Sequence, residues 1–470
     1  MRAMQSPGLE TRVTRRTLLL CAAALSCSAL LAACQAQETA PGGAPVQTDR
    51  TPTPRPATPV IQTGQQLQLR WSMWAGTAAE VALWQELADD VTKAHPQIVV
   101  KLETTSFNDY WDKLQTQLAS GTEADIIAMQ SLRMPVFAVR KALRPLNEFI
   151  SQDPDVDFDD FFPSIANGLS FRGNVYAFGY DVGPIILYYN KQRFDAARVP
   201  YPSSSEPMTW DEYLDICRSL TDEANGFYAF SSGATFDAFV PWLWSGGGDY
   251  MNPEENECTL DQPPAVNALT FYSSLFVSER VAAPITDLAN PLWAIEVFYS
   301  GKIAMHANGP WQFVNIRKNA NFDWDIAPLP AGPAGSITTA AGSGFGISAN
   351  TKYPEEAWKA LRVITSTESL SKLARAGRGY PARKSAVPAF KDPTVPPSHV
   401  DIVEKILSNE IGTARFYKTV TTWQEIAVML QRDFPPVLLG QQTVQETITK
   451  IKPQFDELLK KHSELVKQGG

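Results

Sequence analysis

The sequence is poor in the side chains from which most metal and nucleophilic sites are built. Its 470 residues include four histidines and five cysteines, and the histidines stand far apart, without the spacing of metal ligands. No G-x-S-x-G segment provides a serine nucleophile. Residues 342–346 are rich in glycine, but no lysine and hydroxyl residue follow to complete a phosphate-binding loop. We therefore expect no metal, no cofactor and no enzymatic activity.

Positive charge is scarce as well. The chain has 41 basic and 50 acidic residues, which gives a net charge of −9. Residues 1–33 carry four arginines and one glutamate, so the rest of the chain has a net charge of −12. An acidic chain without a basic cluster does not attract polyanions. The composition argues against nucleic acid as a partner and favours a neutral or cationic ligand.

A long apolar run is also missing near the start of the sequence. Residues 18–33 carry no charge and follow a cluster of arginines, but a membrane span needs about 20 apolar residues. A basic stretch followed by a short apolar one is typical of a signal peptide. The run ends in the letters LAAC at residues 31–34, which resemble the lipobox of bacterial lipoproteins. This resemblance implies a signal peptide of residues 1–33 and a lipid on Cys34. An ordinary cleavage site beside a chance cysteine is the alternative.

Two neighbouring segments indicate how the protein is exported and how its folded part is connected to the membrane. Arg15 and Arg16, with two leucines behind them, resemble a twin-arginine export signal, and the general secretory route is the alternative. Residues 34–65 are dominated by threonine, proline and small residues, which cannot bury enough apolar surface to fold. We interpret residues 34–65 as a lipid anchor and an extended tether. The protein is then expected on the extracytoplasmic side of the cell membrane.

Two cysteines remain beyond residue 34, Cys217 and Cys258. In an exported chain they can form one disulfide, and two buried free thiols fit the sequence equally well. The folded part is expected to run from about residue 67 to about residue 466. Because single cores stop growing at about 250–300 residues, this length predicts two lobes.

Strand and helix patterns alternate through the first part of the folded chain. Residues 67–74 alternate apolar and polar side chains like a half-buried strand, and residues 79–93 place apolar side chains at helical spacing. The series continues with strand 98–102, helix 109–119 and strand 124–129. This order predicts a parallel sheet covered by helices, with ligands at the carboxyl ends of its strands. Residues 74–76 and 130–133 are the loops at those ends.

The later part of the chain mixes the two patterns. Residues 209–220 form an expected helix with a capping box from Thr209 and Glu212, and residues 246–249 an expected turn. Strands are expected at residues 174–178 and 185–189, around a loop of residues 179–184. Further helices are expected at residues 260–277 behind a short strand, 355–365, 367–376, 424–432 and 444–461.

The tryptophans give the best indication of a ligand. Twelve are present, and four of them fall in predicted loops: Trp74, Trp242, Trp244 and Trp311. Indole rings offer flat apolar faces on which the C–H faces of sugar rings can stack, while polar neighbours fix the hydroxyls. Because tryptophans are highly buried on average, a place in the core is the alternative for each one.

Ordered segments along the folded part carry a further signal. They contain YWDKL and ADII (residues 110–127), GNVYA and LYYNK (173–191), MTWDE (208–212), FYSGKIAM and GPW (298–311), WDIAPLP (324–330), GSGFGI (342–347), EAW (356–358) and YPAR (380–383). Together they resemble the extracellular solute-binding proteins of ABC importers, in the family that binds maltose, other oligosaccharides and glycerol phosphodiesters. The chain departs from that family where Gly179 replaces a proline and where residues 198–200 read RVP.

The resemblance implies an α/β fold of the two-lobed, type II periplasmic-binding-protein class. Three segments would cross between the lobes, near residues 181–185, 340–344 and 377–383, and the lobes would close over a ligand in the cleft by a hinge motion. The expected first lobe comprises residues 66–181 and 341–378, and the second lobe comprises residues 182–340 and 379–470.

The resemblance also implies ligand contacts from corresponding loops. Trp74, Trp244 and Trp311 would stack on the ligand. Three polar side chains would hydrogen-bond its hydroxyls: Asp181, Asp249 and Arg378. The full set of expected ligand-binding residues is Trp74, Gln130, Ser131, Asp181, Trp242, Trp244, Gly247, Asp249, Trp311, Ser343, Gly344, Phe345, Arg378 and Tyr380. A bridge between the lobes without ligand contact is the alternative for Asp181 and Arg378, and a purely structural turn for Trp311.

These expectations combine into one function. We expect a solute-binding lipoprotein that captures a mono- or oligosaccharide and delivers it to the transmembrane subunits of an ABC permease, acting as a monomer. A glycerol phosphodiester is the alternative ligand. Its binding needs more than one positively charged side chain in the cleft, and Arg378 is the only clear candidate. Two other classes stay open: a secreted carbohydrate-active enzyme with this fold and a ligand-sensing partner of a membrane receptor.

Overall fold

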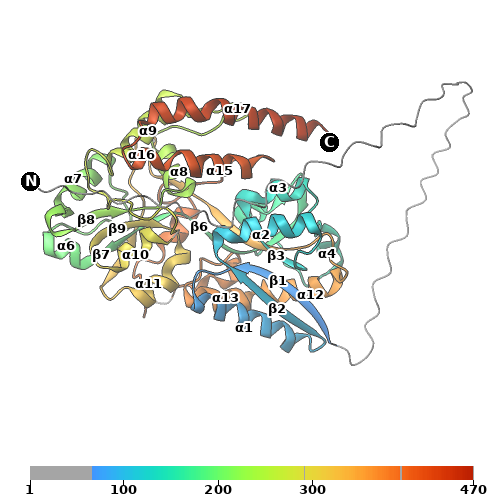
Figure 1. The fold of residues 1–470 in the computed structure, drawn as a ribbon. Helices are drawn as coiled ribbons and strands as arrows, with labels where there is room; N and C mark the ends of the chain where they lie inside the picture. Colours follow the sequence, from blue (N-terminus) through green and yellow to red (C-terminus); the bar gives the residue numbers. More distant parts are fainter. Residues whose placement is uncertain (1–65, 291, 392–393, 469–470) are drawn as a thin grey trace, which may run out of the picture. The chain divides into compact units, whose positions relative to one another are not determined.

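The computed structural model describes residues 66–290, 292–391 and 394–468 (Figure 1). The expected signal peptide, Cys34 and the tether that ends at residue 65 lie outside these residues. Within the described ranges, no helix is both long and apolar enough to cross a membrane.

A five-stranded sheet, here called the first sheet, contains the N-terminal strands. Its order is β2-β1-β3-β12-β6, with β1 at Leu67–Trp74, β2 at Ile98–Thr105, β3 at Ile126–Gln130, β6 at Ala177–Gly183 and β12 at Ala341–Ile347. β1 pairs in parallel with β2 and β3, as the alternating pattern predicts. Two helices connect these strands, α1 (Ala78–Ala94) and α2 (Phe107–Ser120). Each begins at a hydroxyl side chain that accepts a backbone N–H, Thr77 for α1 and Ser106 for α2.

A four-stranded sheet, the second sheet, has the order β10-β7-β9-β8. Its strands are β7 (Ile186–Asn190), β8 (Tyr228–Ser231), β9 (Ile303–Asn308) and β10 (Trp324–Ala327). The helices of this part of the chain are α6 (Lys191–Ala197), α7 (Trp210–Leu220), α8 (Phe236–Ser245), α9 (Pro263–Ser274), α10 (Trp293–Tyr299) and α11 (Phe313–Asn319). The predicted capping box of α7 is present, because Thr209 and Glu212 exchange both hydrogen bonds. Two sheets with their own helices agree with the predicted α/β class.

Further helices and strands lie between and after the strands of the two sheets. They are α3 (Met134–Val139), α4 (Asn147–Gln152), α5 (Pro163–Gly168), β4 (Ser170–Phe171), β5 (Asn174–Val175), β11 (Ile337–Thr339), α12 (Pro354–Ile364), α13 (Thr367–Ala376), α14 (Ile402–Leu407) and β13 (Thr413–Arg415). Helices α12 and α13 confirm two predicted helices. The short strand predicted at the start of residues 260–277 is absent from the described elements, and α9 begins instead at Pro263.

Residues 179–183 form part of β6 and not the predicted loop. All seven residues of β6 are buried. A Cβ atom on Gly179 would lie 2.6 Å from Ile165, and one on Gly183 would lie 2.8 Å from Pro310. The two glycines therefore allow neighbouring side chains to pack closely against the strand. In the sequence alone, glycines at these positions indicated a loop.

The segments that join the two sheets lie side by side. Only two residues separate β6 from β7. Gly183 pairs with Ala341 of β12, and the Thr338 hydroxyl donates to the carbonyl oxygen of Ile185 at 2.7 Å. The third segment joins the same group, because the Val182 N–H donates to the Tyr380 carbonyl at 2.9 Å.

Contacts of residues 380–384 bear on the expected lobe boundary. The Phe162 N–H donates to the Ala382 carbonyl at 3.0 Å, and the Lys384 N–H donates to the Asp160 carbonyl at 2.8 Å. Arg383 and Asp160 form an ion pair at 3.1 Å. This segment thus bonds with residues that pack on the first sheet, although the sequence interpretation assigned it to the second lobe.

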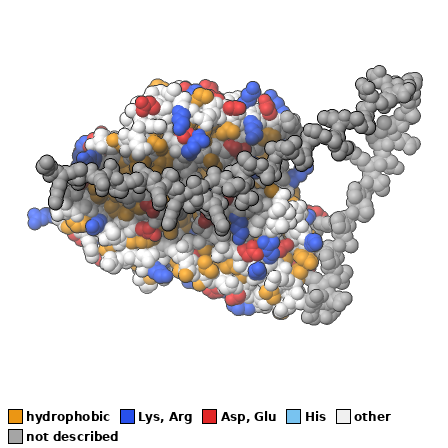
Figure 2. Space-filling view, viewed as in Figure 1, with side chains coloured by type: hydrophobic (Ala, Val, Ile, Leu, Met, Phe, Trp, Pro, Cys, Tyr) orange, Lys and Arg blue, Asp and Glu red, His pale blue; other side chains and the backbone are white. Residues whose placement is uncertain are grey.

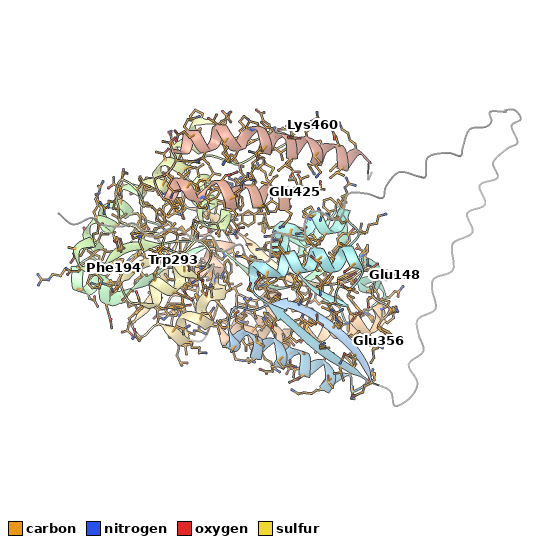
Figure 3. All side chains as sticks on the ribbon, in the orientation of Figure 1. Glu148, Phe194, Trp293, Glu356, Glu425 and Lys460 are labelled. Carbon is orange, nitrogen blue, oxygen red and sulfur yellow. The ribbon has the colours of Figure 1, made fainter. Side chains whose placement is uncertain are left out.

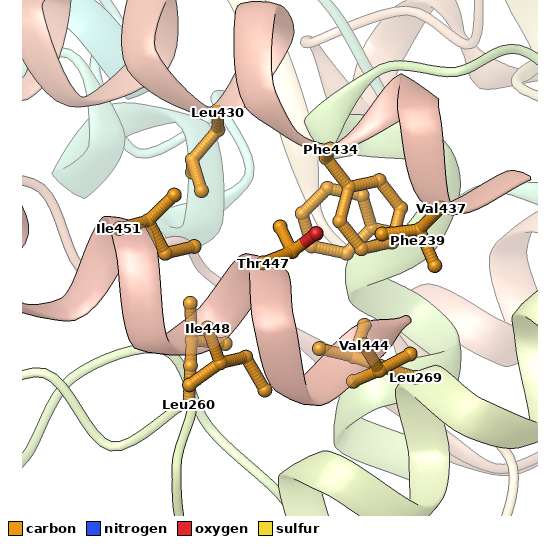
Figure 4. A pocket seen from close by; sticks show the side chains of 10 residues that line it. All are labelled: Phe239, Leu260, Leu269, Leu430, Phe434, Val437, Val444, Thr447, Ile448 and Ile451. Carbon is orange, nitrogen blue, oxygen red and sulfur yellow. The ribbon is translucent and has the colours of Figure 1, made fainter. Parts of the chain in front are cut away.

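The C-terminal helices α15 (Trp423–Asp433), α16 (Pro435–Leu438) and α17 (Val444–Gln468) form a layer beside α8 and α9 (Figures 1 and 3). Lys461 of α17 pairs with Glu425 of α15 at 3.3 Å. Between these helices lies a cavity of about 10 Å³ with almost wholly apolar walls (Figure 4). That volume holds one water molecule at most, so the cavity is a packing gap and not a ligand site.

The two remaining cysteines are free and fully buried. Cys217 lies on α7, whereas Cys258 precedes α9. Burial raises the pKa of both thiols. Of the two alternatives that the sequence left open, the structure has the free thiols.

Candidate functional site

A row of polar side chains crosses three adjacent strands of the first sheet. Ser343 on β12 pairs with Gln130 on β3 and with Asp181 on β6. The Ser343 N–H donates to Asp181 Oδ1 at 2.9 Å, and the Gly342 N–H donates to the Ser131 hydroxyl at 3.4 Å. The sheet therefore brings four predicted site residues together, at the carboxyl ends of β3 and β6 and at the amino end of the antiparallel β12.

A buried cluster of opposite charges adjoins this row. Arg378 Nη1 lies 3.8 Å from Asp181 Oδ2, and Arg378 Nε lies 3.7 Å from Glu80 Oε1. The guanidinium also sits over the rings of Trp84 and Tyr180, at 5.2 and 5.8 Å. Its Nε makes no hydrogen bond to a described residue. Arg378 is thus held by charge and by ring faces, without a tight hydrogen bond to either carboxylate.

The two carboxylates differ in their environment. Glu80 Oε2 accepts the Gly76 N–H at 2.6 Å, which ties it to the loop after β1. Burial raises the pKa of Asp181 to about 6, and the nearby Arg378 charge only partly offsets this.

Trp74 lies where β1 ends, at the expected edge of the sheet. Its ring contacts Phe107, Tyr110 and Trp111 at centroid distances of 5.4, 5.2 and 5.5 Å. Only 7% of Trp74 is exposed. Trp74 is therefore part of a packed aromatic cluster, and little of its surface is accessible to a ligand.

Trp242 and Trp244 lie in α8 and not in a loop, so that prediction was wrong. They are 2% and 1% exposed. Trp242 packs among the rings of Trp210, Tyr213 and other aromatic residues. The segment from residue 236 to 245 is apolar on nearly every face, which is the pattern of a buried helix. Trp242 is thus a core residue.

Asp249, behind the turn at Gly247, is the centre of a polar cluster next to Trp244. It accepts hydrogen bonds from Trp244 Nε1 at 3.1 Å, Arg415 at 2.9 Å and Lys418 at 2.8 Å. Burial opposes ionisation of Asp249, but these donors hold its pKa below the usual value. Gly247 has φ +83°, a turn conformation that glycine adopts without strain. Asp249 is therefore already occupied by partners within the chain.

Trp311 is the most accessible of the four predicted tryptophans. It is half-buried in the turn after β9. Its ring lies over Gly309, and a Cβ on Gly183 would be 3.8 Å from it. Because Gly183 ends β6, the ring reaches the junction of the two sheets.

Three other predicted residues have packing roles. The Phe345 ring is fully buried and stacks on Tyr180 at 4.8 Å. Tyr380 is 1% exposed and packs on Phe390 at 5.0 Å. A Cβ on Gly344 would come within 2.4 Å of the Phe178 carbonyl oxygen. Burial and close packing account for all three residues.

The structure adds a contact between the segment after β3 and helix α15 that sequence reasoning missed. Arg133 follows β3, and its Nη1 donates to Gln424 Oε1 at the start of α15. Its guanidinium lies 4.4 Å from the centre of the Trp111 ring. Arg133 belongs to the predicted site loop 130–133, but nothing in the local pattern pointed to Gln424, 291 residues away.

Charged side chains are mixed on the face shown in Figure 2, where blue and red atoms are interspersed. No group of three or more histidine, cysteine or carboxylate side chains in the described ranges could hold a metal ion. The site offers hydrogen-bond donors, acceptors and aromatic surfaces, with each cation near a carboxylate.

Comparison with known proteins adds to this geometry. Residues 75–370 match the family described as bacterial extracellular solute-binding protein. The lactose-binding protein of Rhizobium radiobacter is 23% identical over 256 residues, which cover 53% of this chain and 58% of that protein.

Two solved structures illustrate the likeness in fold. An ABC substrate-binding protein from Listeria monocytogenes in complex with cycloalternan has a TM-score of 0.77 at 24% identity, over 84% of this chain and 99% of that one. UgpB from Mycobacterium tuberculosis in complex with glycerophosphocholine has a TM-score of 0.69 at 21% identity, over 83% and 98%. The predicted fold, that of the two-lobed binding proteins, is thereby confirmed.

Proposed function

We propose that this chain, which belongs to the family of bacterial extracellular solute-binding proteins, captures a carbohydrate between its two sheets for an ABC importer. The ligand would lie against the polar row of Gln130, Ser343 and Asp181, with Trp311 stacked on a sugar ring. Membership of this family supports delivery of the ligand to the transmembrane subunits of a permease. The identity of the ligand as a carbohydrate is our proposal.

The balance of charge at the site is the observation that carries the carbohydrate proposal. Arg378 lies between two carboxylates, Asp181 and Glu80. A phosphodiester needs cations that carboxylates do not already neutralise. Neutral hydroxyls, in contrast, can both donate to the carboxylates and accept from amide and guanidinium groups.

A glycerol phosphodiester is the second candidate, and the likeness to UgpB with glycerophosphocholine motivates it. Arg415 and Lys418 are the cations that could serve it. Both already donate to Asp249, so this carboxylate offsets part of the positive charge that a phosphate would need.

Hydrolysis of a glycan is the enzymatic alternative. Asp181 has the raised pKa that a general acid needs, but it accepts from Ser343 and faces Arg378. We therefore propose binding without turnover. Incubation of the protein with glycans, followed by chromatography, should return them intact.

A thermal-shift screen tests the ligand class. Neutral mono- and oligosaccharides and glycerophosphocholine are added to the purified protein, each at millimolar concentration. A bound sugar raises the melting temperature by mass action. A shift with glycerophosphocholine and with no sugar would contradict the carbohydrate proposal.

Attachment to the membrane through Cys34 is a separate proposal, because that residue lies outside the described ranges. A lipidated protein should fractionate with membranes, and a Cys34→Ser variant should appear in the soluble extracytoplasmic fraction. Membrane fractionation of both variants distinguishes this from an ordinary signal peptide, for which the two would fractionate alike.

A further inference from the structure

Arg133 connects the end of a strand in the first sheet with a helix of the C-terminal layer. It follows β3 of the first sheet, whereas Gln424 begins α15, which packs beside α8 and α17. Their hydrogen bond joins Arg133 Nη1 to Gln424 Oε1. Any movement that separates the two sheets at this edge must break it.

The surroundings of Arg133 hold its side chain in place for this contact. The guanidinium packs on Trp111 at 4.4 Å, and Trp111 is anchored by Trp74 and Tyr110. Arg133 Nε is buried without a hydrogen-bond partner among the described residues. The ring face and the burial thus hold the arginine in place for its contact with Gln424.

An acidic group on the other side strengthens the attraction. The charge of Asp237, on α8, acts on Arg133, and the charge of Arg133 acts on Asp237. Asp237 accepts the Tyr417 hydroxyl at 2.5 Å. Asp112 on α2 also faces the arginine. Arg133 is therefore attracted across the junction by Asp237 as well as by Gln424.

A second contact crosses at the end of α17. Arg172, in the turn between β4 and β5, donates to the Val466 carbonyl at 3.2 Å. Helix α17 spans 25 residues and packs on α9 and α15, and in Figure 1 its last turns extend toward α3. This contact is exposed, so it contributes less than the half-buried Arg133.

We infer that Arg133, with Gln424 and Asp237 opposite it, is a latch that holds the two sheets together and slows the release of bound ligand. The latch rests on the proposed function, because it regulates retention at the same site. It acts on the closed state and leaves the contacts of the ligand with the polar row unchanged. Loss of a hydrogen bond to a charged group changes an equilibrium by about tenfold to a hundredfold.

Hydrogen–deuterium exchange of the ligand-free protein tests the latch without knowledge of the ligand. Arg133→Ala should speed exchange in residues 420–428, and Gln424→Ala should speed it in residues 130–139. A merely local packing role would affect only the segment that carries the substitution. The double variant should exchange like Arg133→Ala, because Arg133→Ala already removes the bond to Gln424, whereas Gln424→Ala leaves the attraction of Arg133 to Asp237.

Arg140→Ala is the matched control. Arg140 follows the same helix α3 and lines a surface pocket, and it forms no hydrogen bond or ion pair with α15 among the described residues. It should leave exchange in residues 420–428 unchanged. Unchanged exchange across the junction in both Arg133→Ala and Gln424→Ala would overturn the latch.

Ligand release is measured in a second arm, with maltotriose and lactose as probes. Where the unmodified protein binds a probe, Arg133→Ala and Gln424→Ala should raise its dissociation rate by about tenfold or more. If neither probe binds, the proposed ligand class is in question while the exchange arm still decides the latch. Equal dissociation rates in all variants would contradict the latch alone.

Discussion

Asp181 shows what a single residue contributes at this site. It is buried on β6, accepts the Ser343 N–H and faces Arg378 at 3.8 Å. The sequence placed Asp181 at a crossing segment through its family resemblance and left ligand contact and bridging both open. The observed contacts fit a bridge within the site, and they leave ligand contact to experiment.

The pKa of Asp181 predicts a pH dependence of stability. Burial raises it from 3.8 to about 6, so between these pH values the folded state keeps a proton that the unfolded state has released. The contribution of Asp181 to the free energy of unfolding therefore falls as pH rises from about 4 to 6, by at most about 3 kcal/mol. Chemical denaturation of the unmodified protein and of Asp181→Asn, across pH 4–7, measures it. A stability difference between the two that is flat across this window contradicts the assignment.

The tryptophans make a paired prediction. Trp311→Ala should weaken ligand binding by about 1–3 kcal/mol, the scale known for rings stacked on aromatic side chains, with a small effect on stability. Trp242→Ala should instead destabilise the fold by about 3–5 kcal/mol, because it empties a core position, and the folded fraction should bind normally. Calorimetric titration and denaturation of both variants separate the two roles, and equal losses of affinity would refute the distinction.

At the scale of elements, strands β1, β2 and β3 and the helices α1 and α2 between them could be predicted because their apolar periodicity is strong, whereas β12 was not predicted as a strand. Strand β6 was partly missed, since the glycines that allow close packing also signal turns. The loop position of Trp242 and Trp244 was wrong because an apolar helix without an amphipathic stripe gives no helical period. The contact of Arg133 with Gln424 could not be predicted, because it depends on how remote segments pack.

The crossing strands give a prediction at this scale. A Cβ on Gly342 would lie 2.4 Å from Ile165 and 2.7 Å from the Asp181 carbonyl oxygen. Gly342→Ala should therefore destabilise the protein by about 1–3 kcal/mol, as overpacking does. Gly233→Ala is the control, because its Cβ would meet nothing closer than 3.7 Å. Denaturation curves that coincide for the two variants would show that β12 can shift to make room.

For the whole molecule, two kinds of sequence evidence predicted the fold: local patterns and the family resemblance. Local patterns predicted one parallel sheet, while the family resemblance placed residues 341–378 in one lobe with residues 66–181. The pairing of β12 with β3 and β6 was not predicted. No local pattern joins strands that lie more than 150 residues apart in the chain. The proposed lipidation of Cys34 belongs to this scale too, since a lipid there would keep the binding protein near its permease.

The central claim is that the space between the two sheets takes a neutral sugar. Isothermal titration of the purified protein with an oligosaccharide panel, and with glycerophosphocholine for comparison, tests it most directly. We predict saturable binding of at least one saccharide with one site per chain, and no heat from glycerophosphocholine. Binding of glycerophosphocholine with no saccharide bound would contradict the account.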